Sequence, residues 1–149
     1  MRNPNPKTVE IVYAEDNQID RMMVQEALKE SRLINPVRFV DNGEELMDYL
    51  YRRGKYSDMV NKPLPGLILL DLIMPKKDGW EVLEEIKAEP KFRRIPIVVL
   101  TISNSKEDVN KIFDMGAASY IPKPITFDSL ADVIQTLGKY WFEIVELPV

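Results

Sequence analysis

Five short runs rich in Val, Ile and Leu recur along this chain, separated by longer segments in which apolar residues stand three or four apart. The runs are VEIVYA (9–14), VRFV (37–40), GLILLD (66–71), IPIVVLT (95–101) and SYIP (119–122). Such runs are typical of strands, and the nearly continuous apolarity of the third and fourth favours parallel strands that are covered on both faces. Strands alternating with helices predict a parallel sheet joined by right-handed crossovers.

The segments between the runs predict five helices from their apolar stripes. The stripes are Ile19, Met22, Met23 and Ala27; Leu46, Met47, Leu50 and Tyr51; Trp80, Leu83 and Ile86; Val109, Ile112 and Phe113; and Phe127, Leu130, Ala131, Ile134 and Leu137. We expect the third helix to end before Pro90, the fourth at a C′ residue Gly116, and the fifth to be capped by Thr126 or Asp128. The Met and aromatic stripes are expected in the core.

The predicted fold class is therefore α/β: a doubly wound (βα)5 sandwich with a five-stranded parallel sheet. Among such sheets we expect the flavodoxin-like strand order 2-1-3-4-5. A chain of 149 residues is long enough for one domain with a core and too short for two ordinary ones. The segment GKYSDMVNKPLPG (54–66) is interpreted as a long polar loop inserted before the third strand.

Composition excludes several classes of function. The chain has no Cys and no His, which removes thiolate nucleophiles, Ser-His-Asp devices and histidine-bound zinc. A net charge of −4 gives no reason to expect nucleic acid as a partner. No apolar stretch reaches the ~20 residues of a membrane helix, and the polar start MRNPNPKTVE lacks the apolar segment of a secretion signal. We expect a cytoplasmic protein without membrane contact.

Polar residues stand at the ends of four expected strands. Glu15 and Asp16 follow the first, Asp71 ends the third, Thr101 ends the fourth and Lys123 follows the fifth. The carboxyl ends of parallel strands meet at one edge of the sheet, which is where open α/β sheets bind their ligands. Each of these residues alone is an ordinary cap, packing or surface residue, so the prediction rests on their joint placement.

Three crowded carboxylates repel one another, and a hard divalent cation such as Mg²⁺ or Mn²⁺ would neutralise them. Lys123 adds an ammonium group and Thr101 a hydroxyl, and the whole set matches a phosphoryl group. Asp71 is the expected nucleophile, because it lies on a central strand and leaves Glu15 and Asp16 to hold the metal. The sequence has neither G-x-x-x-x-G-K-[ST] nor G-x-G-x-x-G, so a partner or a small donor must supply the phosphoryl group.

Four motifs in order, AEDN (14–17), LLDLIMPKKDGW (69–80), VVLT (98–101) and YIPKP (120–124), resemble the receiver domain of two-component response regulators. The resemblance extends from Thr8 to Tyr140. It implies one receiver domain over residues 1–149, with a core at about 8–140, a C-terminal tail at 141–149 and no output domain.

The resemblance implies that a histidine kinase passes a phosphoryl group to Asp71. It also implies that Asp16, Asp71 and the backbone carbonyl of Ile73 hold Mg²⁺, while Glu15 acts through a coordinated water. In this interpretation the protein is a phosphoacceptor that assists its own phosphorylation and dephosphorylation, and it is not a turnover enzyme.

A switch is also implied by the resemblance. Thr101 and Lys123 would contact the phosphoryl oxygens, and the Lys123–Pro124 bond would be cis. Movement of Thr101 with inward rotation of Tyr120 would then alter the protein-binding face formed by the fourth helix, the fifth strand and the fifth helix.

The ending GKYWFEIVELPV (138–149) and the segment 54–66 resemble single-domain regulators that partner bacterial phytochromes, which are light-sensing histidine kinases. An exposed YWFEIV (140–145) would suit a homodimer, and the alternative is that this apolar end folds back on its own domain. A histidine phosphotransfer protein is a further expected partner if the chain is an intermediate in a multi-step relay.

Two isoleucines bear on the lifetime of the phosphorylated state. The resemblance places Ile73 and Ile102 beside the phosphoryl group, where many family members carry a polar and a smaller residue respectively. Our hypothesis is that these side chains hinder the attacking water.

Two rival functions fit part of the pattern. A phosphatase of the haloacid dehalogenase type also uses a strand-end Asp with Mg²⁺, but such enzymes carry a second acid two residues later, where this chain has Ile73. The second rival is a receiver-like interaction module that never uses its phosphorylation site.

Overall fold

Five parallel strands form one sheet in the order β2-β1-β3-β4-β5. The computed structural model describes residues 10–30, 35–74, 76–101, 105–123, 129, 132–133 and 135–137. The strands are β1 (Ile11–Ala14), β2 (Val37–Val40), β3 (Leu67–Leu70), β4 (Ile97–Thr101) and β5 (Ser119–Pro122). Every neighbouring pair is parallel, so the predicted fold class and strand order are confirmed.

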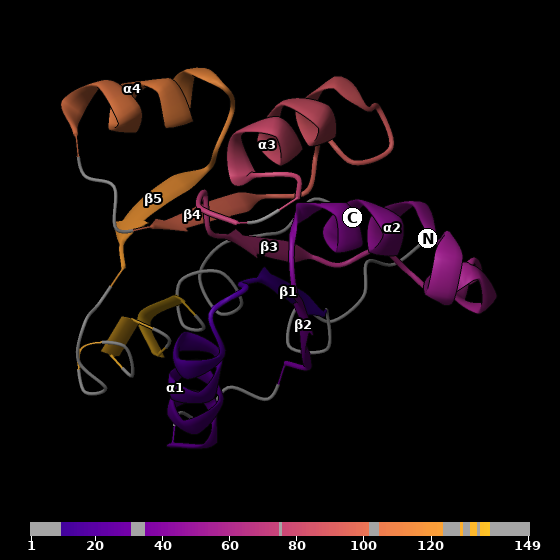
Figure 1. Ribbon diagram of the computed structural model, residues 1–149, viewed down its shortest axis with the longest axis horizontal. Coiled ribbons are helices and arrows are strands. Elements are labelled where there is room, and N and C mark those ends of the chain that lie inside the picture. Colours follow the sequence, from indigo (N-terminus) through magenta and orange to yellow (C-terminus); the bar gives the residue numbers. More distant parts are fainter. Residues whose placement is uncertain are drawn as a thin grey trace.

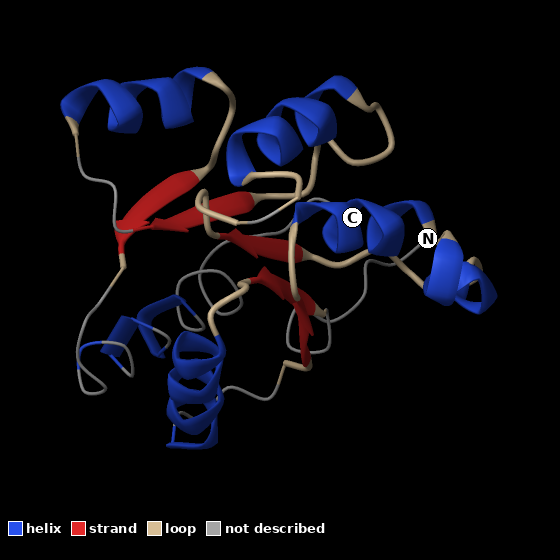
Figure 2. Ribbon diagram, in the orientation of Figure 1, coloured by secondary structure: helices blue, strands red, loops and turns tan. Residues whose placement is uncertain are grey.

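Helices cover both faces of the sheet (Figures 1 and 2). One face carries α2 (Gly43–Tyr51), α3 (Gly79–Ala88) and α4 (Lys106–Asp114), and the other carries α1 (Gln18–Glu30). The described helical residues between 129 and 137 lie on the α1 side, where Leu137 joins the same apolar cluster as Val24 and Ala27. Among the described residues, no helix combines the length and the apolarity needed to cross a membrane.

Alternate residues of each strand feed two separate cores, because successive strand side chains point to opposite faces. On β1, Val12 and Ala14 join the core formed with α2 and α3, whereas Ile11 and Tyr13 join the core formed with α1. β1, β3 and β4 are buried along their whole length. This double cover explains why their sequences are apolar without alternation.

The apolar stripe of α1 is only partly buried. Val24 and Ala27 are in the core and Met23 packs against it, but Ile19 and Met22 are 70% and 63% exposed. The prediction that this stripe is core is therefore wrong for Ile19 and Met22. The buried face of α1 is centred on Val24 and Ala27. At about 100° per residue, Ile19 and Met22 are turned more than about 100° away from the middle of that face, so their side chains are exposed.

The ends of α3 and α4 follow the sequence signals. α3 ends at Ala88, before Pro90, and α4 is followed by Gly116 in the left-handed region, with φ of 99°. Both predictions are confirmed. Phe113 of α4 is 48% exposed, so its expected core position is wrong, whereas Ile112, one residue earlier, is fully buried. The expected caps at 126 and 128 lie outside the described residues.

The segment 54–66, predicted as a polar loop, begins with a 3-10 helix, η2 (Gly54–Met59). Tyr56 is buried and packs edge-on against Tyr49 of α2, with ring centroids 4.9 Å apart. Arg52 donates a hydrogen bond of 2.8 Å to the carbonyl of Pro63. These contacts of Tyr56 and Arg52 give the segment an ordered structure, which its polar composition did not predict. Because it leads into the start of β3, it lies at the edge of the sheet opposite the carboxyl ends of the strands.

Candidate functional site

Backbone hydrogen bonds that continue the sheet beyond β1 and β3 bring two acidic residues side by side. The amide of Glu15 donates to the carbonyl of Val40 at 3.1 Å, and the amide of Asp71 donates to the carbonyl of Ala14 at 3.3 Å. Asp71 therefore lies beside Glu15, although they are distant in sequence.

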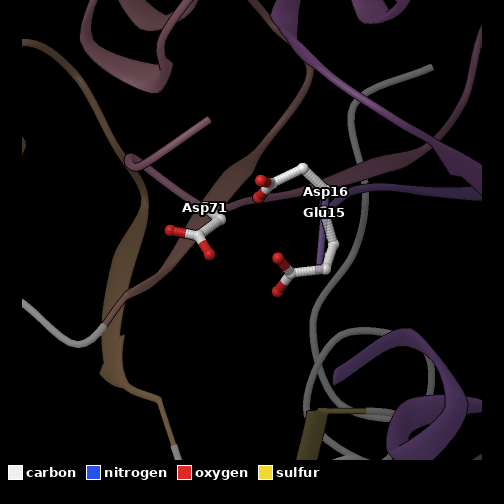
Figure 3. Close-up of side chains that lie close together, drawn as sticks. All are labelled: Glu15, Asp16 and Asp71. Carbon is white, nitrogen blue, oxygen red and sulfur yellow. The ribbon is translucent and has the colours of Figure 1, made fainter. Parts of the chain in front are cut away.

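Three carboxylates gather at this edge. Glu15, Asp16 and Asp71 each offer an oxygen atom, and these atoms lie within 4.8 Å of one another. Figure 3 shows the side chains of Glu15 and Asp16, from the end of β1, grouped with that of Asp71, from the end of β3. Glu15 and Asp71 are buried, whereas Asp16 is exposed. Buried anions at this separation repel one another unless positive charge compensates them.

The loop after β3 holds the Asp71 carboxylate through a backbone hydrogen bond. The amide of Ile73 donates to Asp71 Oδ1 at 3.0 Å, and the amide of Gly79 donates to the carbonyl of Leu72 at 2.9 Å. A Cβ atom at Gly79 would lie 2.4 Å from Leu72 Cα and 2.6 Å from the Asp71 carbonyl oxygen. Only glycine fits so closely against this backbone.

Lys123 places its ammonium group among the acids. Its Nζ lies 2.8 Å from Asp71 Oδ2 and 2.7 Å from Asp20 Oδ2, and it also contacts Glu15 Oε1. The side chain of Lys123 is largely buried. Its position follows from the sheet, because the Lys123 amide donates to the carbonyl of Thr101 at 2.9 Å, one residue beyond the β4–β5 ladder.

The crowding shifts two titratable groups in opposite senses. The pKa of the Glu15 carboxyl is raised to about 7, chiefly by burial and also by the charge of Asp71, although Lys123 acts against this. Burial by itself would lower the pKa of Lys123, but its contacts with Asp20, Asp71 and Glu15 outweigh burial and raise that pKa above its usual range. Lys123 is therefore a permanent cation at neutral pH.

The remaining predicted residues occupy the expected edge. Thr101 is buried at the end of β4, and Tyr120 of β5 is partly buried and packs against the core on the α3 and α4 side. Ile73 lies beside Asp71 with its side chain 59% exposed. Ile102 and the Lys123–Pro124 bond lie outside the described residues, so the cis assignment stays a prediction.

Two residues that sequence reasoning missed belong to this site: Gly79 and Asp20. Asp20 is in the first turn of α1, where its amide donates to Asn17 Oδ1 at 3.0 Å. Asp20 follows Asn17, whose side chain caps the helix start, by three residues, and this place in the first helical turn was the available signal.

The donor set fits a hard divalent cation. The three carboxylates offer only oxygen ligands, two from buried residues and one from an exposed residue that water can reach. Mg²⁺ and Mn²⁺ are bound in this way, by one or two carboxylates together with water and substrate oxygens. The roles predicted for the Ile73 carbonyl and for a water on Glu15 stay predictions.

Comparisons with known proteins agree with this geometry. The family described as the response regulator receiver domain matches residues 11–135. The chain is 40% identical over 144 residues to the response regulator Rcp1 of Synechocystis sp., covering 97% of this chain and 95% of Rcp1. The phosphorylated cyanobacterial phytochrome response regulator RcpA has a TM-score of 0.86 at 39% identity, covering 95% of this chain and 99% of that chain. The Mn²⁺-bound form of Rcp1 has a TM-score of 0.84 at 39% identity, with the same 95% and 99% covered.

Proposed function

Because this chain belongs to the response regulator receiver domain family, we propose that it acts in two-component signalling by accepting a phosphoryl group on Asp71. The observation that carries the proposal is the environment of Asp71. Its carboxylate is buried at the edge of the sheet, with two further carboxylates within reach of one cation and the Lys123 ammonium 2.8 Å away.

The residues divide the work of phosphoryl transfer. An oxygen of the Asp71 carboxylate attacks phosphorus; an O–P bond forms, the P–N bond to the histidine of the kinase breaks, and that histidine takes up a proton. Lys123 and Thr101 would stabilise the phosphoryl oxygens. Glu15, Asp16 and Asp71 would hold Mg²⁺, with the Ile73 carbonyl as a further ligand, and the bound ion would neutralise the charge that develops on those oxygens.

The partners follow from the family. A histidine kinase is the donor that receiver domains imply, and the similarity to Rcp1 and RcpA supports a bacterial phytochrome as that kinase. We propose a cytoplasmic location, a homodimer as the signalling form, and a histidine phosphotransfer protein as a further exchange partner. In this proposal the domain is a phosphoacceptor and not a turnover enzyme.

The output is proposed to be a change of surface at α4 and β5. Thr101 would move toward the phosphoryl group, and Tyr120, which is only partly buried beside α4, would turn inward. A local change of charge would thereby shift the population of two surface conformations.

Intact mass measurement after incubation with acetyl phosphate and Mg²⁺ tests the proposal. We expect the chain to gain one phosphoryl group, and we expect this gain to be lost in Asp71→Asn and in samples without metal. Failure of the wild-type chain to gain mass, both with acetyl phosphate and with a phytochrome-type kinase, would favour the phosphorylation-independent module. Sustained turnover of a phosphomonoester would instead revive the phosphatase.

A further inference from the structure

One cation, the Lys123 ammonium, is shared by three carboxylates. Two of them, Glu15 and Asp71, belong to the cluster that suits a divalent cation. The third, Asp20, does not belong to that cluster, yet its Oδ2 atom is 2.7 Å from Nζ. The Lys123 ammonium and a divalent cation therefore compete for Glu15 and Asp71 but not for Asp20.

A divalent cation bound by Glu15, Asp16 and Asp71 would repel the Lys123 ammonium. It would also compete with the ammonium for the carboxylate oxygens of Glu15 and Asp71. A largely buried ammonium that loses its partners without replacement is strongly destabilised. Asp20 offers such a replacement, because it already contacts Nζ and lies on a different element, α1, from the acids that would turn to the metal.

The position of Asp20 is well defined. Its amide is held by the side chain of Asn17 at the start of α1, and its own side chain is one-third exposed. An acid that keeps part of its hydration can hold a cation at a smaller desolvation cost than the buried Glu15 and Asp71.

We propose that Asp20 is a positioning residue for Lys123: it retains the ammonium when a divalent cation occupies Glu15, Asp16 and Asp71, and it thereby strengthens the binding of that cation. The inference rests on the proposed function, which supplies the metal. It predicts that the effect of Asp20 on metal affinity acts through Lys123.

A double-mutant cycle tests this, with the dissociation constant of Mn²⁺ measured by titration calorimetry on the full chain. Asp20→Asn is expected to weaken Mn²⁺ binding by about fivefold or more, a typical coupling for contacting charges. Lys123→Met removes the competing ammonium and is expected to tighten Mn²⁺ binding. In the Lys123→Met background, the loss caused by Asp20→Asn is expected to shrink to less than about twofold.

Matched variants separate positioning from simple charge. Asp41 follows β2 directly and pairs with Arg21. Asp41→Asn therefore also removes one acid, and it is expected to leave the Mn²⁺ affinity nearly unchanged. Asp20→Glu keeps the carboxylate and is expected to restore part of the affinity. Thermal unfolding of each variant confirms that it is folded.

Three results would overturn the inference. If Asp20→Asn lowers the Mn²⁺ affinity equally in both backgrounds, Asp20 acts by a through-space charge effect. If Asp20→Asn does not lower the affinity, its contact with Lys123 is an ordinary surface ion pair. If Lys123→Met binds Mn²⁺ as the wild type does, the ammonium does not compete with the metal. If the wild-type chain and Asp71→Asn bind Mn²⁺ equally weakly, the proposed metal site itself fails, and that outcome is distinct from the other three.

Discussion

Gly79 links the fold to the chemistry of a single carboxylate. Because its missing Cβ would lie within 2.6 Å of the Asp71 backbone, any side chain must push the loop after β3 away. We expect Gly79→Ala to lower the free energy of unfolding by about 1–3 kcal/mol, the usual cost of overpacking. It should also slow phosphorylation by acetyl phosphate, since Asp71 moves with its loop. Denaturant unfolding and intact mass against time measure the two effects.

Gly54→Ala is the matched control. Gly54 has φ of 62°, but a Cβ there would make only an ordinary van der Waals contact, with Asp48 Oδ2 at 3.9 Å. It should cost about 1–2 kcal/mol through backbone strain alone and leave phosphorylation unchanged. If Gly79→Ala phosphorylates at the wild-type rate, the packing of Gly79 does not position Asp71.

Ile73 is suited to control how long the phosphorylated state lasts. Its amide donates to the Asp71 carboxylate, and its apolar side chain is more than half exposed. Ile73→Asn should let water approach and speed dephosphorylation about threefold to tenfold, equal to about 0.7–1.4 kcal/mol in barrier height. The decay of the phosphorylated mass after removal of acetyl phosphate measures this. Ile73→Val should decay at nearly the wild-type rate; equal rates in the wild type and Ile73→Asn would contradict the hypothesis.

At the scale of elements, α1 presents an apolar surface beside the acidic site. Ile19 directly precedes Asp20, which contacts Lys123, and Ile19 and Met22 are both largely exposed. A partner protein must come close to Asp71 to deliver a phosphoryl group. We therefore expect the pair Ile19→Ser and Met22→Ser to slow phosphotransfer from a phytochrome-type kinase by about tenfold, since burying one such side chain is worth about 1.5–3 kcal/mol.

Acetyl phosphate separates docking from chemistry in this experiment. It needs no protein contact, so the double variant should accept its phosphoryl group at the wild-type rate. Val60→Ser is the matched surface control, because Val60 is equally exposed but follows η2 at the opposite edge of the sheet. A loss with acetyl phosphate, or an equal loss with Val60→Ser, would argue against a docking role for α1.

Strands were easier to predict than helix faces for a physical reason. A central parallel strand is buried on both faces, so the sequences of β3 and β4 are apolar runs whichever face each side chain points to. A helix is buried on one side only, and its phase is set by the sheet that it covers. The stripe through Ile19 and Met22 has a helical period, but α1 is rotated so that Val24 and Ala27 are buried instead, and this leaves Ile19 and Met22 exposed.

At the scale of the whole molecule, strand order determines which acids meet. The predicted order 2-1-3-4-5 places β1 beside β3, and this alone brings Glu15 and Asp71 together. Predicting the contact between Lys123 and Asp20 requires more than strand order, namely the path of the chain just after β5 and the rotation of α1. Sequence patterns do not contain that geometry, so the acidic cluster was predicted and its additional acid was not.

The same crowding predicts that the whole domain is stabilised by Mg²⁺. Folding brings three acids within 4.8 Å of one another, whereas the unfolded chain keeps Asp71 far from the other two. A cation that binds only the folded form at 100 times its dissociation constant adds about 2.7 kcal/mol to the free energy of unfolding. For a chain of 149 residues this corresponds to a rise of about 5–10 °C in Tm. Thermal unfolding with and without Mg²⁺ measures it, at matched ionic strength so that screening is constant.

Asp16→Asn tests whether this stabilisation arises at the site. Asp16 is exposed and lies outside the acids that contact Lys123, so its neutral variant should unfold within about 0.5 kcal/mol of the wild type when no metal is present. With Mg²⁺, it should lose most of the rise in Tm, because one of three ligands has lost its charge. A full rise in Asp16→Asn would mean that Mg²⁺ stabilises the domain elsewhere, through surface carboxylates, and would remove the thermodynamic support for a metal at the carboxyl ends of β1 and β3.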